Sequence, residues 1–261
     1  MPVLAWLMVC GAAAAQNLKP NILNEKLVYE VMFKWGIIEK TAGEVKLETV
    51  PEDDSEFFMS VLTGRSVDLA NDIYTVNDTL RGRISKLTME PVNYERIAHE
   101  GGGFYKNSVN YYKDEAGNFN GDASSYSCDS NGFEQQGKKL MTATGITLDM
   151  LSSLYFARYL DYATMTPGDS VQFNIFTGNN QQRLQLNYVG PTQLTVPYLN
   201  EVCDVYEVSF TFTYADNDKT KTSSPIVAWV SMDDKRIPYQ LDGKLPIGGI
   251  RCQLSGVEFA E

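Results

Sequence analysis

Short segments in which apolar and polar residues alternate recur along the chain, and they constrain its fold more than any other feature. Because successive side chains of a β-strand point to opposite faces, this pattern predicts strands with one buried face. Eight segments are predicted as strands: 26–33, 43–49, 57–62, 107–113, 171–177, 183–189, 203–214 and 225–232.

The segments between these predicted strands contain residues that favour tight turns. Clusters of Gly, Pro, Asn and Asp occur at 51–54, 114–117, 178–180, 190–191 and 216–218. Consecutive strands joined by such short links must run antiparallel, since a parallel partner needs a crossover of a dozen or more residues. The sequence therefore predicts a mainly β fold, as a strongly curved antiparallel sheet or a partly open β-barrel.

One segment, 147–160, has the period of a helix instead. Thr147 is predicted to cap its start, and Arg158 places a positive charge in its last turn. Two adjoining apolar stripes predict burial on more than one side. The stripes consist of Leu148, Leu151, Tyr155 and Tyr159, and of Met150, Leu154 and Ala157. A second, shorter helical turn is predicted at 66–74.

The sequence indicates a single β-rich domain over 16–261, in which two halves of the sheet could meet near 140–147. No segment resembles a linker between two domains. The polar stretch 118–136 is interpreted as a long exposed connection.

The first fifteen residues have the features of an export signal. Residues 3–15 carry no charge and are too few to cross a bilayer, and they end in the small-residue run Ala13-Ala14-Ala15. Residues 1–15 are therefore predicted to be a signal peptide, which places the mature chain outside the cytoplasm. An alternative is a lipoprotein signal in which Cys10 is acylated and anchors the chain.

Three cysteines remain after removal of such a signal: Cys128, Cys203 and Cys252. The odd number requires at least one free thiol. Cys203 and Cys252 lie in strand-like segments and could pair in an oxidising compartment, or all three could be free.

Composition disfavours several classes of function. With 22 basic and 33 acidic residues the net charge is −11, which disfavours nucleic acid as a partner. The chain contains one histidine, His99, and histidine is the usual general base and a common metal ligand, so both kinds of site are disfavoured. Segment 132–139 resembles a phosphate-binding loop, but Lys139 stands where Ser or Thr should hold magnesium. No cofactor and no metal site are predicted.

The order of several short motifs resembles that of the family called domain of unknown function 3108. They run from a first hairpin, 25–31 with 42–45, through 72–78, 89–94 and the helix with Asp149 and Arg158, to 228–238. The resemblance spans about 24–256. It implies an exported, β-rich protein of the periplasm or cell envelope of a Gram-negative bacterium, without an assigned catalytic residue.

The function predicted from these features is non-enzymatic. The curved sheet would bind or scaffold an amphiphilic ligand (a lipid, a lipoprotein or a glycan) in its concavity. Arg158 either binds carbonyls or a carboxylate, such as Asp161 three residues on, or faces the ligand. The candidate ligand-binding residues are Arg158, Tyr155, Trp229, Tyr111, Phe173 and Tyr188.

The alternative is a polysaccharide hydrolase. Such an enzyme needs two carboxylates that face one cleft about 5–10 Å apart. The sequence contains many acidic residues but does not indicate which two would form the pair.

Overall fold

The computed structural model describes residues 21–52, 56–67, 74–178, 180–216, 219–245 and 248–259. The predicted signal peptide and most of the predicted helical turn at 66–74 lie outside these residues. The first half of the described chain is all strands: β1 (Glu25–Trp35), β2 (Ile38–Pro51), β3 (Phe57–Ser66), β4 (Val76–Ser85), β5 (Pro91–Glu100), β6 (Gly103–Lys113), β7 (Phe119–Cys128) and β8 (Glu134–Ala143).

The second half begins with a short strand and the helix. Its elements are β9 (Thr147–Leu148), α2 (Met150–Arg158), β10 (Ser170–Thr177), β11 (Asn180–Val196), β12 (Glu201–Asp216), β13 (Lys219–Thr222), β14 (Ile226–Ser231), β15 (Pro238–Lys244) and β16 (Gly249–Phe259).

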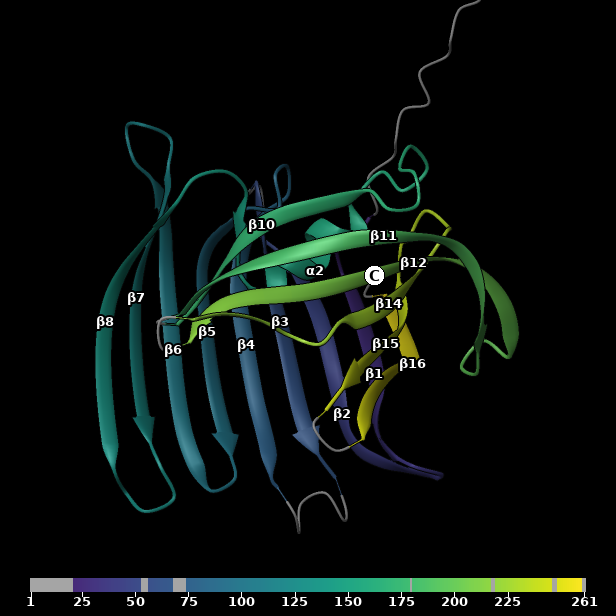
Figure 1. The fold of residues 1–261 in the computed structure, drawn as a ribbon, viewed down its shortest axis with the longest axis horizontal. Helices are drawn as coiled ribbons and strands as arrows, with labels where there is room; N and C mark the ends of the chain where they lie inside the picture. The colour runs from purple at the N-terminus through teal and green to yellow at the C-terminus, as the bar shows by residue number, and fades with distance from the viewer. Residues whose placement is uncertain are drawn as a thin grey trace, which may run out of the picture.

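All the described strands belong to one sheet, as the alternating pattern predicts. Its order is β8-β7-β6-β5-β4-β3-β2-β1-β16-β15-β14-β12-β11-β10-β9, with β13 paired to β12. Neighbours are antiparallel except β9 and β10, which are parallel. Figure 1 shows β10 to β12 running across the strands of the first half, with α2 between the two parts of the sheet. The predicted fold class, a strongly curved antiparallel sheet close to a barrel, is confirmed.

The sheet curves because its pairing is interrupted by register shifts. They lie between Val28 and Tyr29, Val31 and Met32, Arg83 and Ile84, Tyr188 and Gly190, and Trp229 and Val230. A bulge of this kind bends its strand and increases the local twist, which brings the two ends of the sheet toward each other.

The two ends of the sheet approach each other along a seam that strand pairing does not close. Side chains cross it instead: Tyr111 Oη donates to the Phe176 carbonyl at 2.9 Å, and Asn174 Nδ2 donates to the Thr144 carbonyl at 3.0 Å. Gly121 permits this approach, since a Cβ there would lie 2.8 Å from the Phe176 ring. The seam is therefore held by side-chain hydrogen bonds and ring packing rather than by paired strands.

The helix is shorter than predicted and begins later. Its N-cap is Asp149, not Thr147: the Asp149 carboxylate accepts from Ser152 N at 2.7 Å, and Ser152 Oγ accepts from Asp149 N at 2.8 Å. Thr147 is already paired to β10 in β9, so its backbone is extended. The reciprocal capping box satisfies two helix-start donors and fixes the first turn.

The prediction of a long exposed connection at 118–136 is wrong. The segment contains β7 and the start of β8. Its hydroxyl and glycine residues hid the strand pattern, although Phe119, Gly121 and Ala123 are buried, with Asn120 buried between the first two. Pairing to strands on both sides stabilises β7 despite its polar outer face.

The buried residues form two clusters on two sides of α2. One includes Leu151 and Tyr155, and the other includes Leu148 and Ala157 with residues of β10, β11, β12 and β14. Of the two apolar stripes predicted for this segment, Leu148, Leu151, Tyr155 and Ala157 are buried and Leu154 and Tyr159 are partly buried, whereas Met150 is exposed. Cys128, Cys203 and Cys252 are free thiols in the structure.

Candidate functional site

An apolar cavity of about 180 Å³ lies between α2 and the second half of the sheet. The helix contributes its second apolar stripe, Met150, Leu154 and Ala157, while Ser153 and Arg158 complete its side of the lining. The strands contribute Phe173 from β10, Leu184 from β11, Phe210 and Phe212 from β12, Ile226, Ala228 and Val230 from β14, and Pro238 and Leu241 from β15.

The opposite stripe of α2 fixes the helix against the first half of the sheet. The Tyr155 ring meets the Phe58 ring edge-on at 5.2 Å between centroids, and Tyr155 Oη and Ser60 Oγ are 2.8 Å apart. Leu151 and Tyr155 are both fully buried. The helix is thereby anchored on one side, and the side that faces β10 to β15 retains free volume.

The two polar side chains of the cavity have their hydrogen-bonding groups engaged elsewhere. Ser153 Oγ donates to the Met150 carbonyl at 2.9 Å. The Arg158 guanidinium binds the Glu25 carboxylate and the carbonyls of Lys235 and Arg236. The cavity wall therefore presents carbon atoms to any occupant and suits a hydrocarbon group.

Arg158 and Glu25 form a buried ion pair at the C-terminal end of the helix. Nη1 lies 2.6 Å from Glu25 Oε1 and Nη2 lies 2.9 Å from Oε2, a two-point arrangement. Both side chains are about 1% exposed. Of the two interpretations left open for Arg158, its contacts are those of the structural one, with Glu25 in place of Asp161 as the bound carboxylate.

At the other end of the helix, the Asp149 carboxylate is fully buried. Its Oδ2 has no hydrogen-bond partner among the described residues. Burial raises the pKa of Asp149 to about 6, although the hydrogen bonds from Ser152 act in the opposite direction. The capping carboxylate therefore titrates closer to neutrality than an exposed aspartate does.

Of the six residues predicted to bind a ligand, the structure brings Arg158 and Phe173 together in the cavity lining. Tyr155 lies on the other side of α2, and Tyr111 lies at the seam against the Phe176 ring. Tyr188 packs on Tyr162 and Tyr206.

Trp229 faces the opposite side of the sheet from the cavity. It stands between Ala228 and Val230 on β14, both of which line the cavity, so alternation directs its side chain away. Its Nε1 donates to Glu207 at 3.0 Å. The alternation within 225–232 already places Trp229 on the other face from Ala228 and Val230. Aromatic character alone does not reveal this difference.

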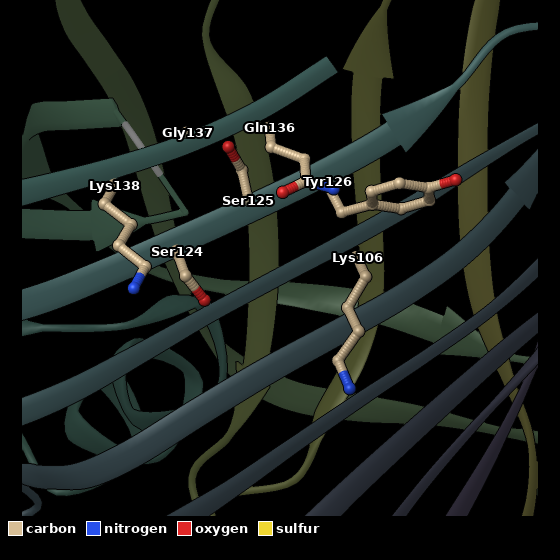
Figure 2. A pocket seen from close by; sticks show the side chains of 7 residues that line it. All are labelled: Lys106, Ser124, Ser125, Tyr126, Gln136, Gly137 and Lys138. Carbon is tan, nitrogen blue, oxygen red and sulfur yellow. The ribbon is translucent and has the colours of Figure 1, made fainter. Parts of the chain in front are cut away.

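A second concave feature, of about 400 Å³, lies on the outer face of β6, β7 and β8. Figure 2 shows the side chains that line it: Lys106, Ser124, Ser125, Tyr126, Gln136, Gly137 and Lys138. This depression is polar and open, in contrast to the apolar interior cavity.

Comparison with known proteins identifies the family. The model of DUF3108, described as a protein of unknown function, matches residues 28–255. The chain belongs to the DUF3108 family. The family resemblance noted in the sequence is therefore confirmed. A search of curated proteins finds no match.

One solved structure supports the fold of this DUF3108 protein. It is similar to a β-barrel-like protein of domain of unknown function DUF1849 from Brucella abortus, with a TM-score of 0.58, 8% identity and coverage of 92% of this chain and 99% of that one. A candidate exported protein with YmcC-like fold from Bacteroides fragilis gives a TM-score of 0.40 at 10% identity, with coverages of 92% and 98%. A candidate lipoprotein from Parabacteroides distasonis gives 0.37 at 8% identity, with the same coverages.

In the described part of this DUF3108 chain, no helix has the length and apolar character needed to span a bilayer.

Proposed function

We propose that this DUF3108 protein is an exported, non-enzymatic protein of the cell envelope that binds the acyl chain of a lipid or lipoprotein in the cavity beside α2. The observation that carries the proposal is the cavity lining, in which strand and helix residues are apolar and the two polar side chains are already hydrogen-bonded. The polar head of an amphiphile would stay outside, near Met150, which is 38% exposed.

The physical basis is burial of hydrocarbon in a space that water does not fill well. Apolar cavities of about 150 Å³ stay dry and bind small apolar molecules. Each methylene transferred from water contributes about 0.8 kcal/mol. A glycan, by contrast, would leave its hydroxyl groups without partners on this wall, at a cost of about 1–3 kcal/mol each. An acyl chain therefore suits the cavity better than a sugar does.

Export is supported by the uncharged segment 3–15 and by the Ala13-Ala14-Ala15 run at its end. We place the mature protein in the periplasm or attached to the envelope, the latter if Cys10 is acylated. Comparing the mass of the protein purified from a bacterial envelope with that of the unprocessed chain tests both forms.

The binding test uses two substitutions at neighbouring positions of β14. Ala228→Phe places a ring in the cavity, whereas Val227→Phe places it on the opposite face of the same strand. Binding of dodecanoic acid is measured by calorimetry on the mature chain. Ala228→Phe should abolish binding and Val227→Phe should retain it, with both variants still folded by circular dichroism.

Equal affinity of the two variants for dodecanoic acid would show that the fatty acid binds outside the cavity. The absence of binding to the unmodified chain would remove the proposal altogether.

The described carboxylates give the alternative, polysaccharide hydrolysis, no specific support. Asp78 and Glu100 come near each other, but both bind the guanidinium of Arg96. Both carboxylates are therefore held in ion pairs with Arg96, which gives them a structural role, and we do not propose hydrolysis.

A further inference from the structure

The outer depression on β6, β7 and β8 points to a second binding site, independent of the apolar cavity. Five of its seven lining residues lie in two rows across three paired strands, and Ser125 and Gly137 form the row between them. Lys106 pairs with Tyr126 and Tyr126 with Gln136, while Ser108 pairs with Ser124 and Ser124 with Lys138. No register shift interrupts these strands, so the members of both rows point to the same side of the sheet.

That side is the outer one. Val109, Ala123 and Met141, at the alternate positions of the same strands, are buried in the core. Lys106, Gln136 and Lys138 are exposed, and Tyr126 is partly exposed. Figure 2 shows Lys138 beside Ser124 and Lys106 beside the Tyr126 ring, as their pairing requires.

The lining combines an aromatic ring, hydroxyl and amide groups, and two ammonium groups, but no carboxylate. Lys106 is paired to Glu95, 3.0 Å away, which lies outside the lining. Lys138 has no ion-pair partner among the described residues. The chain as a whole has a net charge of −11, which repels anions. This depression, with two lysines and no acidic lining residue, differs locally from that overall charge.

We propose that this depression binds an acidic saccharide. A sugar ring has an apolar C–H face, which can lie on the Tyr126 ring, and a rim of hydroxyl groups, which Ser124 and Gln136 can hydrogen-bond. The free ammonium of Lys138 binds the carboxylate of the sugar, and Lys106 supplies a second cation on the other side of the ring. From ideal strand spacings, the Cα atoms of the two lysines are about 12 Å apart.

Tyr126 also faces one group that opposes anions. The pKa of Tyr126 is raised by burial and by the neighbouring Glu134. Glu134 lies beyond Gln136 on one side, and the exposed Asp122 lies one row beyond Ser124 on the other, so the saccharide carboxylate belongs between them, at Lys138.

The test is a titration of the mature chain with tetragalacturonate, followed by calorimetry at low salt. Lys138→Gln removes the free cation, and Lys40→Gln removes an exposed lysine of β2 as a control for net charge. Lys138→Gln should weaken binding about tenfold, because it removes a charge-assisted hydrogen bond. Lys40→Gln should change it less than about twofold, as expected for a distant, screened surface charge.

Two further ligands separate the contributions. The methyl-esterified tetramer keeps the sugar rings but lacks the charge, and it should bind about as weakly as the Lys138→Gln complex. Tetraglutamate keeps the charge but lacks the sugar rings. Tyr126→Leu should therefore weaken the binding of tetragalacturonate and leave the binding of tetraglutamate unchanged.

Three results would each overturn the proposal. The charged and esterified sugars could bind equally, the two lysine substitutions could have equal effects, or tetraglutamate could bind as tightly as the sugar. An absence of binding would overturn it as well. Because Ala228→Phe leaves the outer face unchanged, this site should survive in that variant whether or not the cavity binds a fatty acid.

Discussion

The guanidinium of Arg158, the last residue of the interior helix, forms two hydrogen bonds with the carboxylate of Glu25, the first residue of β1. The pair joins positions 133 residues apart in the chain. It fixes the C-terminal end of α2 against the strand at which the first and last parts of the sheet meet, since β1 pairs with both β2 and β16. The position of the helix, and with it the cavity, depends on this contact.

Removing one partner of this pair should destabilise the protein strongly. Arg158→Met leaves the Glu25 carboxylate buried without its cation and also leaves the carbonyls of Lys235 and Arg236 unpaired. Urea unfolding should show a loss of about 3–5 kcal/mol in the free energy of unfolding. In the double variant with Glu25→Gln the loss should be smaller than the sum of the two single losses, and additive losses would mean that the pair contributes no coupling.

Stability should depend on pH through Asp149. Its folded pKa of about 6 lies above the value of about 3.9 for an unfolded aspartate, so folding favours the protonated form. This contribution is complete below pH about 4 and is lost as the pH rises through about 6, a difference of up to about 3 kcal/mol.

The matched variant for that effect is Asp149→Asn, which keeps a good N-cap but cannot ionise. Its free energy of unfolding, measured by urea titration from pH 4 to 7, should fall less with rising pH than that of the unmodified chain. Identical slopes for the two proteins would assign the pH dependence to other groups.

Closure of the seam should be sensitive to one glycine. A Cβ on Gly121 would lie 2.8 Å from the Phe176 ring and 2.9 Å from Val109 Cγ1, so Gly121→Ala forces β7 away from β10. We expect a loss of about 1–3 kcal/mol in thermal or urea unfolding. Gly64→Ala is the control, because the nearest atom to its Cβ is Val45 Cγ2 at 3.8 Å, and comparable losses in both variants would contradict the packing described for the seam.

The strands with regular apolar alternation could be predicted from the sequence, and so could the helix. The segments predicted at 26–33 and 203–214 lie within β1 and β12, and the helix packs between two buried clusters, although Met150 at its start is exposed. What the pattern missed are strands such as β7 and β8, whose outer positions carry Ser, Gln and Lys. Their stability comes from pairing with neighbours, which a local pattern does not reveal.

The candidate site could be predicted only in part. Of the six residues predicted to bind a ligand, Arg158 and Phe173 line the cavity, and their role in binding stays a prediction. The other walls come from four strands whose meeting depends on the closing of the sheet, and the partner of Arg158 is far away in the chain. These relationships are set by tertiary packing, so spacing in the sequence does not contain them.

The most direct test of acyl-chain binding locates the chain inside the protein. Methyl NMR spectra of the mature protein are recorded during titration with dodecanoic acid, with the exposed Leu87 and Leu140 as surface references. The account predicts shifts at the methyl groups of Met150, Leu154 and Ala157 that saturate together, while those of Leu87 and Leu140 stay unchanged. Shifts confined to the surface references, with the three cavity methyls unmoved, would contradict it.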